Sequence, residues 1–501
     1  MAWKSILIKP FAQQVARQIS RLSKDDAAID AQEAVFKHLI LRGSKTAFGR
    51  DHHFTNIKNY NDFKNNVPIR DYEALKPYVE RVKKGEKDVL WTGKPAYFAK
   101  TSGTTSGMKY IPITADSIPN HFGSAKNALF NYYAQTGKGK WLDGKQIFLS
   151  GSPELQIVNG IKTGRLSGIS NHMIPKWLKT SQLPDYDTNC IEDWETKIDA
   201  IVHQTIGQPM SLISGIPPWV QMYYEKLLDV TGKKTVKEVF PNYDVFVYGG
   251  VNYEPYRAKL EHLVGEHVDS VETYPASEGF IAFQDSQNDK GLWLNVDSGI
   301  FFEFVPTSDI FSENPIRLSL KDVELHVNYA LILNNNAGLW GYNIGDTIQF
   351  VSKNPYRIIV SGRIKHYISA FGEHVIGKEV EEALLLVADT EGVRINEFHV
   401  APQVVPPENG LPYHEWFIEF DNMPVNMPDF AAKLDKAMLQ QNIYYADLIV
   451  GNILRPLVIR PLMRDAFREH MKSEDKLGGQ NKVPRLANDR VIATALHKYK
   501  I

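Results

Sequence analysis

The sequence predicts an α/β protein with a large N-terminal domain of mixed sheets, a hinge and a small α+β C-terminal domain. Strand-like and helix-like segments alternate from about residue 95 to 365, which is typical of an α/β sheet that binds ligands at its strand ends. Strand-like segments become denser between Gly299 and Val360, which predicts a β-barrel-like subdomain within the large domain. A short basic link at 361–366 then separates this region from the rest of the chain.

The elements of the large domain follow from β-rich segments that end in glycine-rich or serine-rich turns. Residues 25–90 are rich in charge and predict helices with loops. Beyond them the predicted strands include 146–150, 244–248 and 270–274, and the predicted helices between them include 192–205 and 218–230. The segment Asn-Asn-Asn-Ala-Gly at 334–338 predicts a tight turn between two strands.

The second domain is expected to begin after the basic link. A helix is predicted over 378–388, because four apolar residues fall on one helical face: Val380, Ala383, Leu384 and Val387. We therefore expect a large domain at 1–361, a hinge at 362–367 and a small mobile domain at 368–501.

Composition excludes several classes of protein. The chain has 501 residues, 43% of them hydrophobic and 23% charged, as in ordinary globular proteins, and its length suits more than one domain. A formal net charge of −1 gives no reason to expect a nucleic-acid partner. No apolar run is long enough to span a bilayer. The single cysteine, Cys190, excludes an intramolecular disulfide and favours a cytoplasmic location.

Two interpretations stay open for the basic, mildly amphipathic start of the chain, residues 1–23. It fits a helix lying on a membrane surface. It also fits a helix packed on the large domain, which we favour because amphipathic helices usually face a core. The residues expected to make that contact are Trp3, Ile6, Ile8, Phe11 and Val15.

A glycine loop rich in hydroxyl groups, Thr101–Lys109, is the first candidate for ligand binding. Glycines let the backbone approach an anion closely and direct N–H groups at it, and Lys109 offers a positive charge. The loop is not a Walker motif, because the Gly-Lys-Ser/Thr ending is missing. A flexible linker is the alternative, but the β-like flanks at 96–99 and 110–113 favour a loop held at both ends.

Two carboxylates follow further along the chain, each at the end of an apolar segment. Glu278 closes Tyr-Pro-Ala-Ser-Glu at 274–278 and suits magnesium, a cation that prefers oxygen ligands. Tyr274 can stack on a base, with Gly249 and Gly250 as the floor beside it. Asp346 closes 341–346 and can accept hydrogen bonds from both ribose hydroxyls. Each segment alone fits an ordinary turn, but together and in this order they indicate one nucleotide site.

A last candidate lies near the C-terminus, where two glycines precede Lys482 and Arg485 in the segment 478–485. A lysine on a flexible loop can reach a phosphate or carboxylate as charge develops on it. The alternative is a solvated basic loop.

Taken in order, these segments resemble the ATP motifs of adenylate-forming enzymes, the superfamily of acyl-CoA synthetases, nonribosomal adenylation domains and firefly luciferase. Residues 362–382 look like the hinge motif of that superfamily. Within it, the chain most resembles the auxin-responsive Gretchen Hagen family of acyl-acid–amido synthetases. The resemblance spans roughly residues 90 to 490 and is carried by Gly-Thr-Thr-Ser-Gly at 103–107, Gly-Leu-Trp-Gly-Tyr at 338–342 and Gln-Asn-Lys-Val-Pro-Arg at 480–485.

The resemblance implies the adenylate-forming enzyme fold and a two-step reaction that uses ATP and magnesium. A carboxylic acid attacks the ATP α-phosphate, giving an acyl-adenylate and pyrophosphate. An amine, expected to be an amino acid, then displaces AMP to form an amide. The expected partners are therefore small-molecule acids and amines. Positioning and charge stabilisation carry such a reaction without a protein nucleophile.

The resemblance also implies roles for individual residues, motif by motif. Phosphate contacts are implied for Ser102, Gly103, Thr104 and Thr105, and nucleotide contacts for Gly250, Tyr274, Ser277 and Arg363, with Tyr274 by the adenine. Asp346 is expected to hold the ribose and Glu278 the magnesium ion. Lys365 is expected at the hinge pivot, and Lys482 is expected to neutralise charge during adenylation.

The chain departs from the family pattern in three places. Plant members usually carry arginines where this chain has Gly341 and Asn343, and the spacing from Gly107 to Lys109 is one residue shorter than theirs. The hinge segment is closer to the acyl-CoA synthetase form. These differences indicate a distant member and carry over no hormone specificity.

Two alternative functions remain. An acid–thiol ligase with CoA as acceptor shares the first half-reaction, and only the 480–485 ending favours the amide. A catalytically silent nucleotide-binding or scaffold protein is the other alternative. The presence of Glu278, Asp346 and Lys482 argues against it, because loss of such groups would remove transition-state stabilisation.

Overall fold

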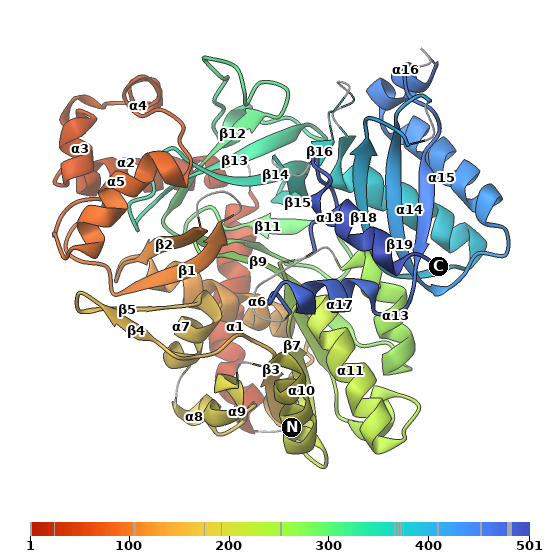
Figure 1. The fold of residues 1–501 in the computed structure, drawn as a ribbon. Coiled ribbons are helices and arrows are strands. Elements are labelled where there is room, and N and C mark those ends of the chain that lie inside the picture. Colours follow the sequence, from red (N-terminus) through yellow and green to blue (C-terminus); the bar gives the residue numbers. More distant parts are fainter. Residues whose placement is uncertain are drawn as a thin grey trace. The chain divides into compact units, whose positions relative to one another are not determined.

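A computed structural model gives the fold, drawn in Figure 1. It describes residues 3–24, 26–103, 107–174, 176–191, 193–250, 253–364, 367–368, 370, 373, 375–407, 410–450, 453–477 and 483–501. The chain forms two compact units, the first made of residues 1–251 and 264–360 and the second of residues 252–263 and 361–501. Among the described residues, no helix combines the length and apolar content needed to cross a membrane.

One large sheet dominates the first unit. The strands that it contains among the described residues are, in spatial order, β12 (Ile300–Pro306), β13 (Asn328–Asn335), β14 (Tyr342–Lys353), β15 (Tyr356–Arg363), β11 (Leu292–Leu294), β10 (Gly279–Phe283), β9 (Asp269–Ala276), β8 (Val245–Gly249), β7 (Met210–Ser214), β3 (Lys145–Phe148) and β6 (Gln182–Leu183). Strands β6, β3, β7, β8 and β9 run parallel, and β9 pairs antiparallel with β10. The sheet is therefore mixed, as expected, and the carboxyl ends of β8 and β9 lie at the same edge.

The prediction of a β-barrel-like subdomain is wrong. Strands β12 to β15 extend the large sheet, because β15 pairs with β11 and so joins them to the parallel half. No closed barrel forms among the described strands. A high density of strands is compatible with an open sheet or a barrel, and the pairing of the last strand decides between them.

A smaller sheet carries the glycine loop. Its spatial order is β2 (Gly107–Ile113), β1 (Tyr97–Gly103), β5 (Ile161–Gly164) and β4 (Gln156–Val158). The α-helices among the described residues of the first unit are α1 (Trp3–Leu22), α2 (Ala27–Gly43), α3 (Ala47–Asp51), α4 (Tyr60–Asn66), α5 (Tyr72–Lys83), α6 (Ser124–Thr136), α7 (Leu166–Met173), α8 (Lys176–Lys179), α9 (Tyr186–Cys190), α10 (Trp194–Thr205), α11 (Pro217–Thr231) and α12 (Val236–Val239). Helices α10 and α11 confirm the two helices predicted between the strands.

Helix α1 packs on the first unit, as the favoured interpretation expected. It contacts α6 (Figure 1) and buries Ile8, Val15 and Ile19 in the main hydrophobic core. Phe11 was expected in this contact, but its side chain is 60% exposed, and Ala12 is buried in its place. Successive helical residues are 100° apart, so a one-residue error in the assigned face moves a side chain from core to solvent. The side chains of Trp3 and Ile6 lie outside the described part of the structure.

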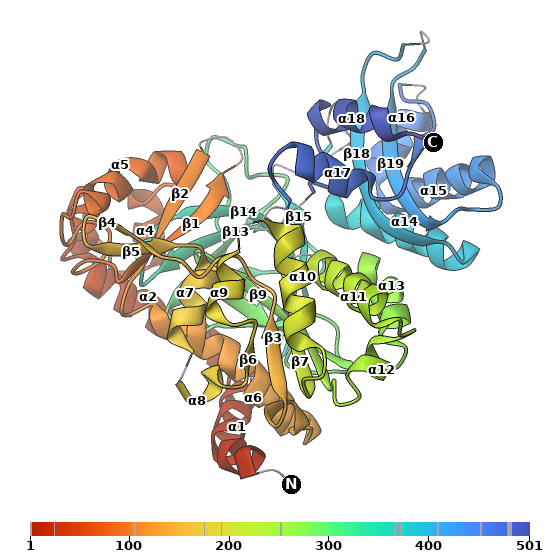
Figure 2. The same cartoon turned by 60° about the horizontal axis from the view of Figure 1, so that its bottom comes forward.

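The second unit contains a three-stranded sheet between helices, among its described residues (Figure 2). Successive residues of β19 face opposite sides, since Trp416 packs in one apolar cluster with α14 and α15, and Phe417 in another with α17 and α18. The α-helices and strands described for this unit are α13 (Glu254–Val264), β16 (Tyr367–Ile368), β17 (Val375–Ile376), α14 (Gly377–Glu391), β18 (Arg394–Gln403), β19 (Tyr413–Asn422), α15 (Met427–Gln441), α16 (Ile443–Val450), β20 (Val458–Leu462), α17 (Ala466–Ser473) and α18 (Val491–Leu496). Helix α14 confirms the predicted helix, with its expected apolar face buried.

Candidate nucleotide site

Tyr274 and Asp346, predicted from separate segments, are in direct contact. The Tyr274 hydroxyl donates a 2.6 Å hydrogen bond to Oδ2 of Asp346, and both side chains are buried. Tyr274 lies near the carboxyl end of β9 and Asp346 on β14. A hydrogen bond to an ionised carboxylate is short and stronger than one between neutral groups. The structure therefore brings together the residues expected beside the adenine and at the ribose.

Glu278 is held at both its backbone and its side chain. Ala276 pairs with Gly279, so Ser277 and Glu278 form the two-residue turn of the β9–β10 hairpin. The Glu278 carbonyl accepts a 2.7 Å hydrogen bond from the Asn335 amide, and its Oε1 accepts one of 3.3 Å from the Tyr342 hydroxyl. Burial and the neighbouring Glu278 charge raise the pKa of Tyr342 well above its usual value. Tyr342 therefore stays a donor to this carboxylate.

Steric constraints explain the glycine pair at the end of β8, where Gly249 is the last residue of the strand and Gly250 follows it. A Cβ atom on Gly249 would lie 2.3 Å from the Thr273 carbonyl oxygen of the neighbouring strand β9. Gly250 has a φ of +79°, a conformation that favours glycine. The pair thus lets β8 end close against the strand that delivers Tyr274.

The glycine loop is a hairpin, which confirms that it is held at both ends. Strands β1 and β2 pair antiparallel up to Gly103 and Gly107. Ser102 and Gly103 are the last residues of β1, while Thr104 and Thr105 lie outside the described residues. The ammonium group of Lys109 lies 5.7 Å from the centre of the Tyr72 ring.

One short segment at the start of α5 connects this hairpin to the strand of Asp346. The Tyr110 N–H on β2 donates to the Tyr72 hydroxyl at 2.9 Å. Two residues earlier, the Arg70 N–H donates to the Gly341 carbonyl at 2.8 Å, and the Asn343 N–H donates to the Arg70 carbonyl at 2.9 Å. The glycine hairpin and β14 are therefore fixed to the same piece of backbone.

Gly341, one of the positions where we expect a departure from the family pattern, has little space for a side chain. Its φ is +56°, and a Cβ atom would lie 2.5 Å from the Pro68 carbonyl oxygen. Gly345 also has a positive φ, of +87°, but a Cβ atom there would meet no other atom within 4 Å. The departure at 341 is thus built into the backbone of this chain.

The structure gives less detail for the other predicted site residues. Ser277 is buried in the hairpin turn beside Glu278, and Arg363 ends β15. Lys365 and Lys482 lie outside the described residues.

The chemistry of this site suits a magnesium–nucleotide complex. Within the described part of the chain, no group of three or more His, Cys, Asp or Glu side chains can hold a metal ion. One carboxylate, such as that of Glu278, is enough for Mg²⁺, because this ion usually takes one or two carboxylates and completes its shell with phosphates and water. The sequence interpretation missed Asn335 and the Tyr342 hydroxyl, which hold Glu278 in place. The three consecutive asparagines indicated only a turn.

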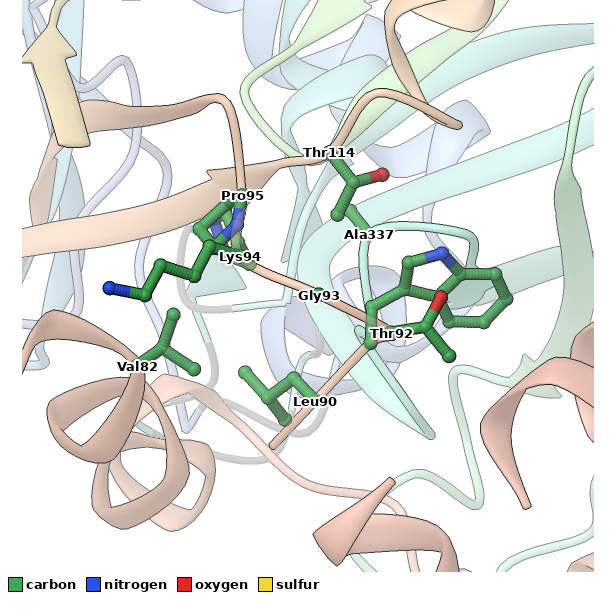
Figure 3. Close-up of a pocket in the computed structure, with 10 residues that line it drawn as sticks. Val82, Leu90, Thr92, Gly93, Lys94, Pro95, Thr114 and Ala337 are labelled. Atoms are coloured by element: carbon green, nitrogen blue, oxygen red, sulfur yellow. The ribbon is translucent and has the colours of Figure 1, made fainter. Parts of the chain in front are cut away.

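A small pocket in the first unit is unrelated to these residues. Figure 3 shows it between α5, the end of β2 and the β13–β14 turn. Its lining contains none of the predicted site residues and consists of Val82, Leu90, Trp91, Thr92, Gly93, Lys94, Pro95, Pro112, Thr114 and Ala337.

Three domain models of one family match the chain in order. The GH3 family N-terminal domain matches residues 16–183, the central domain residues 293–363 and the C-terminal domain residues 378–491. Jasmonoyl–L-amino acid synthetase JAR4 of Nicotiana attenuata is 22% identical over 67% of this chain and 69% of its own length. Indole-3-acetic acid-amido synthetase GH3.3 of Arabidopsis thaliana is 21% identical over 92% and 91%.

Solved structures share the fold. The AtGH3.15 acyl acid amido synthetase in complex with 2,4-DB superposes with a TM-score of 0.80 at 15% identity, covering 98% of this chain and 96% of that one. A 2-hydroxyisobutyryl-CoA ligase in the post-adenylation state gives a TM-score of 0.62 at 10% identity, covering 94% and 92%. Both confirm the predicted α/β architecture of adenylate-forming enzymes.

Proposed function

The chain belongs to the GH3 family, and from this premise we propose that it is an ATP-dependent acyl-acid–amido synthetase. The acid attacks the α-phosphate of ATP, so a P–O bond forms to the carboxylate oxygen and the bond to pyrophosphate breaks. The amine then attacks the acyl carbon, the amide C–N bond forms, and AMP leaves. Relatives named for amide synthesis with jasmonate or indole-3-acetic acid support this class of reaction.

The observation that carries the proposal is the contact between Tyr274 and Asp346 in the first unit. It brings together two residues of the proposed nucleotide site that lie 72 residues apart in the sequence. Glu278, four residues after Tyr274, is tied to the strand of Asp346 by the Tyr342 hydroxyl. The glycine hairpin is tied to the same strand through the Arg70–Tyr72 segment.

Within this proposal, each residue of the first unit has a distinct task. Ser102, Gly103, Thr104 and Thr105 hold phosphates, and Asp346 accepts from the ribose hydroxyls. Tyr274 lies by the adenine, with Gly250 and Ser277 beside the nucleotide. Glu278 holds magnesium, and the ion, when bound, withdraws charge from the phosphates.

The resemblance alone supports three further roles. Lys482 neutralises charge as the adenylate forms, Arg363 contacts the nucleotide and Lys365 is the pivot of a hinge at 362–367. We also propose a cytoplasmic location, which the single cysteine supports.

Acid-dependent exchange of labelled pyrophosphate into ATP tests the first half-reaction without knowledge of the amine. Reversible adenylation returns label to ATP only when a usable acid is present. We expect exchange with at least one acid of a mixed pool, and a loss of about 100-fold in Asp346→Ala through weaker ATP binding. Exchange that is independent of acid, or absent with every acid class, would contradict the proposal.

A further inference from the structure

Three consecutive buried asparagines, Asn334 to Asn336, end β13 and begin the turn to β14. Each side-chain amide reaches a different segment of the first unit. Unpaired buried amides are costly, so a run of three needs three sets of partners. Of the three side chains, that of Asn335 bonds to the segment that carries Glu278.

Asn335 connects the turn to Glu278. Its Nδ2 donates to the Glu278 carbonyl at 2.7 Å, while its Oδ1 accepts from the N–H groups of Ala337 and Leu339, each at 3.0 Å. The amide thus uses its acceptor to shape its own turn and its donor to hold another hairpin. A carbonyl in a two-residue turn needs such a partner when it is buried.

The side chains of Asn334 and Asn336 bond to other segments of the first unit. The Asn334 amide donates to Glu303 Oε1 at 2.8 Å, and its Oδ1 accepts from the Gly341 N–H at 2.7 Å, at the start of β14. Asn336 donates to the Asp116 carbonyl at 2.7 Å, beyond the end of β2. Asn335 is therefore the member of this run whose amide holds the backbone of the proposed magnesium ligand.

We propose that Asn335 is a positioning residue for nucleotide-bound magnesium, which it serves by fixing residue 278; this inference rests on the proposed function. Tyr342 holds the Glu278 carboxylate from β14. With backbone and side chain both held, the carboxylate is oriented before magnesium arrives, so little ordering remains for binding to complete.

The test removes the amide donor and keeps the acceptor. Asn335→Asp keeps an acceptor for the Ala337 and Leu339 N–H groups but turns a carboxylate oxygen toward the Glu278 carbonyl. Asn336→Asp is the matched control, with the same charge change one residue away and a carbonyl partner at the same 2.7 Å, that of Asp116. ATP affinity is measured by calorimetry across a magnesium titration, and the thermal midpoint is measured without nucleotide.

For Asn335→Asp we expect the magnesium concentration for half-maximal ATP binding to rise about tenfold. ATP affinity without magnesium should change less than about twofold, and Asn336→Asp should leave the magnesium requirement near wild type. If Asn335→Asp does not fold, Asn335→Ala is measured in its place with the same expectation. Equal rises in the magnesium requirement of the variants at 335 and 336, or no rise in the variant at 335, would overturn the inference. Failure of the wild-type protein to bind ATP would instead overturn the proposed function and the inference with it.

Discussion

Tyr274 and Asp346 form a 2.6 Å hydrogen bond between β9 and β14, two strands that are 72 residues apart in sequence at this contact. Tyr274 is 6% exposed and Asp346 is 7% exposed. In the proposed site, this bond orients the carboxylate that receives the ribose. Its removal should therefore affect nucleotide binding more than folding.

Tyr274→Phe removes the hydroxyl and keeps the ring. We expect ATP affinity to fall about tenfold, because one hydrogen bond to a charged group is lost. Tyr132→Phe is the matched control, since the Tyr132 hydroxyl donates to Asp269 at 2.9 Å at the first residue of the same strand β9. Calorimetry with ATP and thermal denaturation should show similar stability losses but an affinity loss only in Tyr274→Phe. Equal affinity losses would argue against an orienting role.

Gly341 should tolerate substitution less than Gly345 does. Both have positive φ, so alanine at either costs about 1 kcal/mol of backbone strain. Only at Gly341 would the new Cβ atom also meet a carbonyl oxygen at 2.5 Å. Gly341→Ala should therefore lower the free energy of unfolding by at least about 2 kcal/mol more than Gly345→Ala in denaturant titrations. Similar values would mean that the Pro68 backbone moves aside easily.

Acid should destabilise each unit through one buried histidine. Burial lowers the pKa of His121, in the first unit, and of His399, in the second, to about 4. Between pH 4 and 6.5 the unfolded chain binds a proton at each histidine that the folded chain does not bind. The free energy of unfolding therefore rises with pH across this window and levels off, as far as these histidines are concerned, above pH 6.5. Each histidine should account for a change of about 3 kcal/mol in the free energy of unfolding across this window. The free energy of unfolding of His121→Gln, measured by denaturant titration, should vary less between pH 6.5 and 4 than that of the wild type. Parallel curves of this free energy against pH for the two proteins would refute the prediction.

Lys482→Ala should separate catalysis from binding. Loss of a charge that acts as the adenylate forms is expected to slow pyrophosphate exchange about 100-fold or more. ATP affinity should fall less than about threefold. Lys476→Ala is the control, because Lys476 is an exposed lysine nearby in sequence that pairs with Glu474 at 3.5 Å. Equal losses of rate and affinity in Lys482→Ala would remove the assigned role.

Local patterns in the sequence predicted much of this fold and pointed to segments that the structure brings together. Helix α14 and the glycine hairpin follow from periodicity and from β-like flanks. Tyr274, Glu278 and Asp346 were grouped by chemistry, and contacts on β9, β10 and β14 bring their segments together.

What the sequence did not predict depends on distant pairings. The open sheet in place of a barrel rests on β15 joining β11. Helix α13 belongs to the second unit, where Lys259 pairs with Asp421 at 2.8 Å across 162 residues. The sequence around Asn335 indicates only a turn. Its bond to the Glu278 carbonyl could not be predicted, because every residue has a backbone carbonyl and nothing in the sequence singles out this one.

The most direct test of the central claim is one incubation of the protein with ATP, magnesium, a pool of carboxylic acids, amino acids and CoA, analysed by mass spectrometry. We predict acid-dependent AMP together with an N-acyl amino acid, which would also identify both substrates. AMP with an acyl-CoA and no amide would contradict the amido synthetase and make the protein a thiol ligase. No AMP with any acid would contradict adenylation itself.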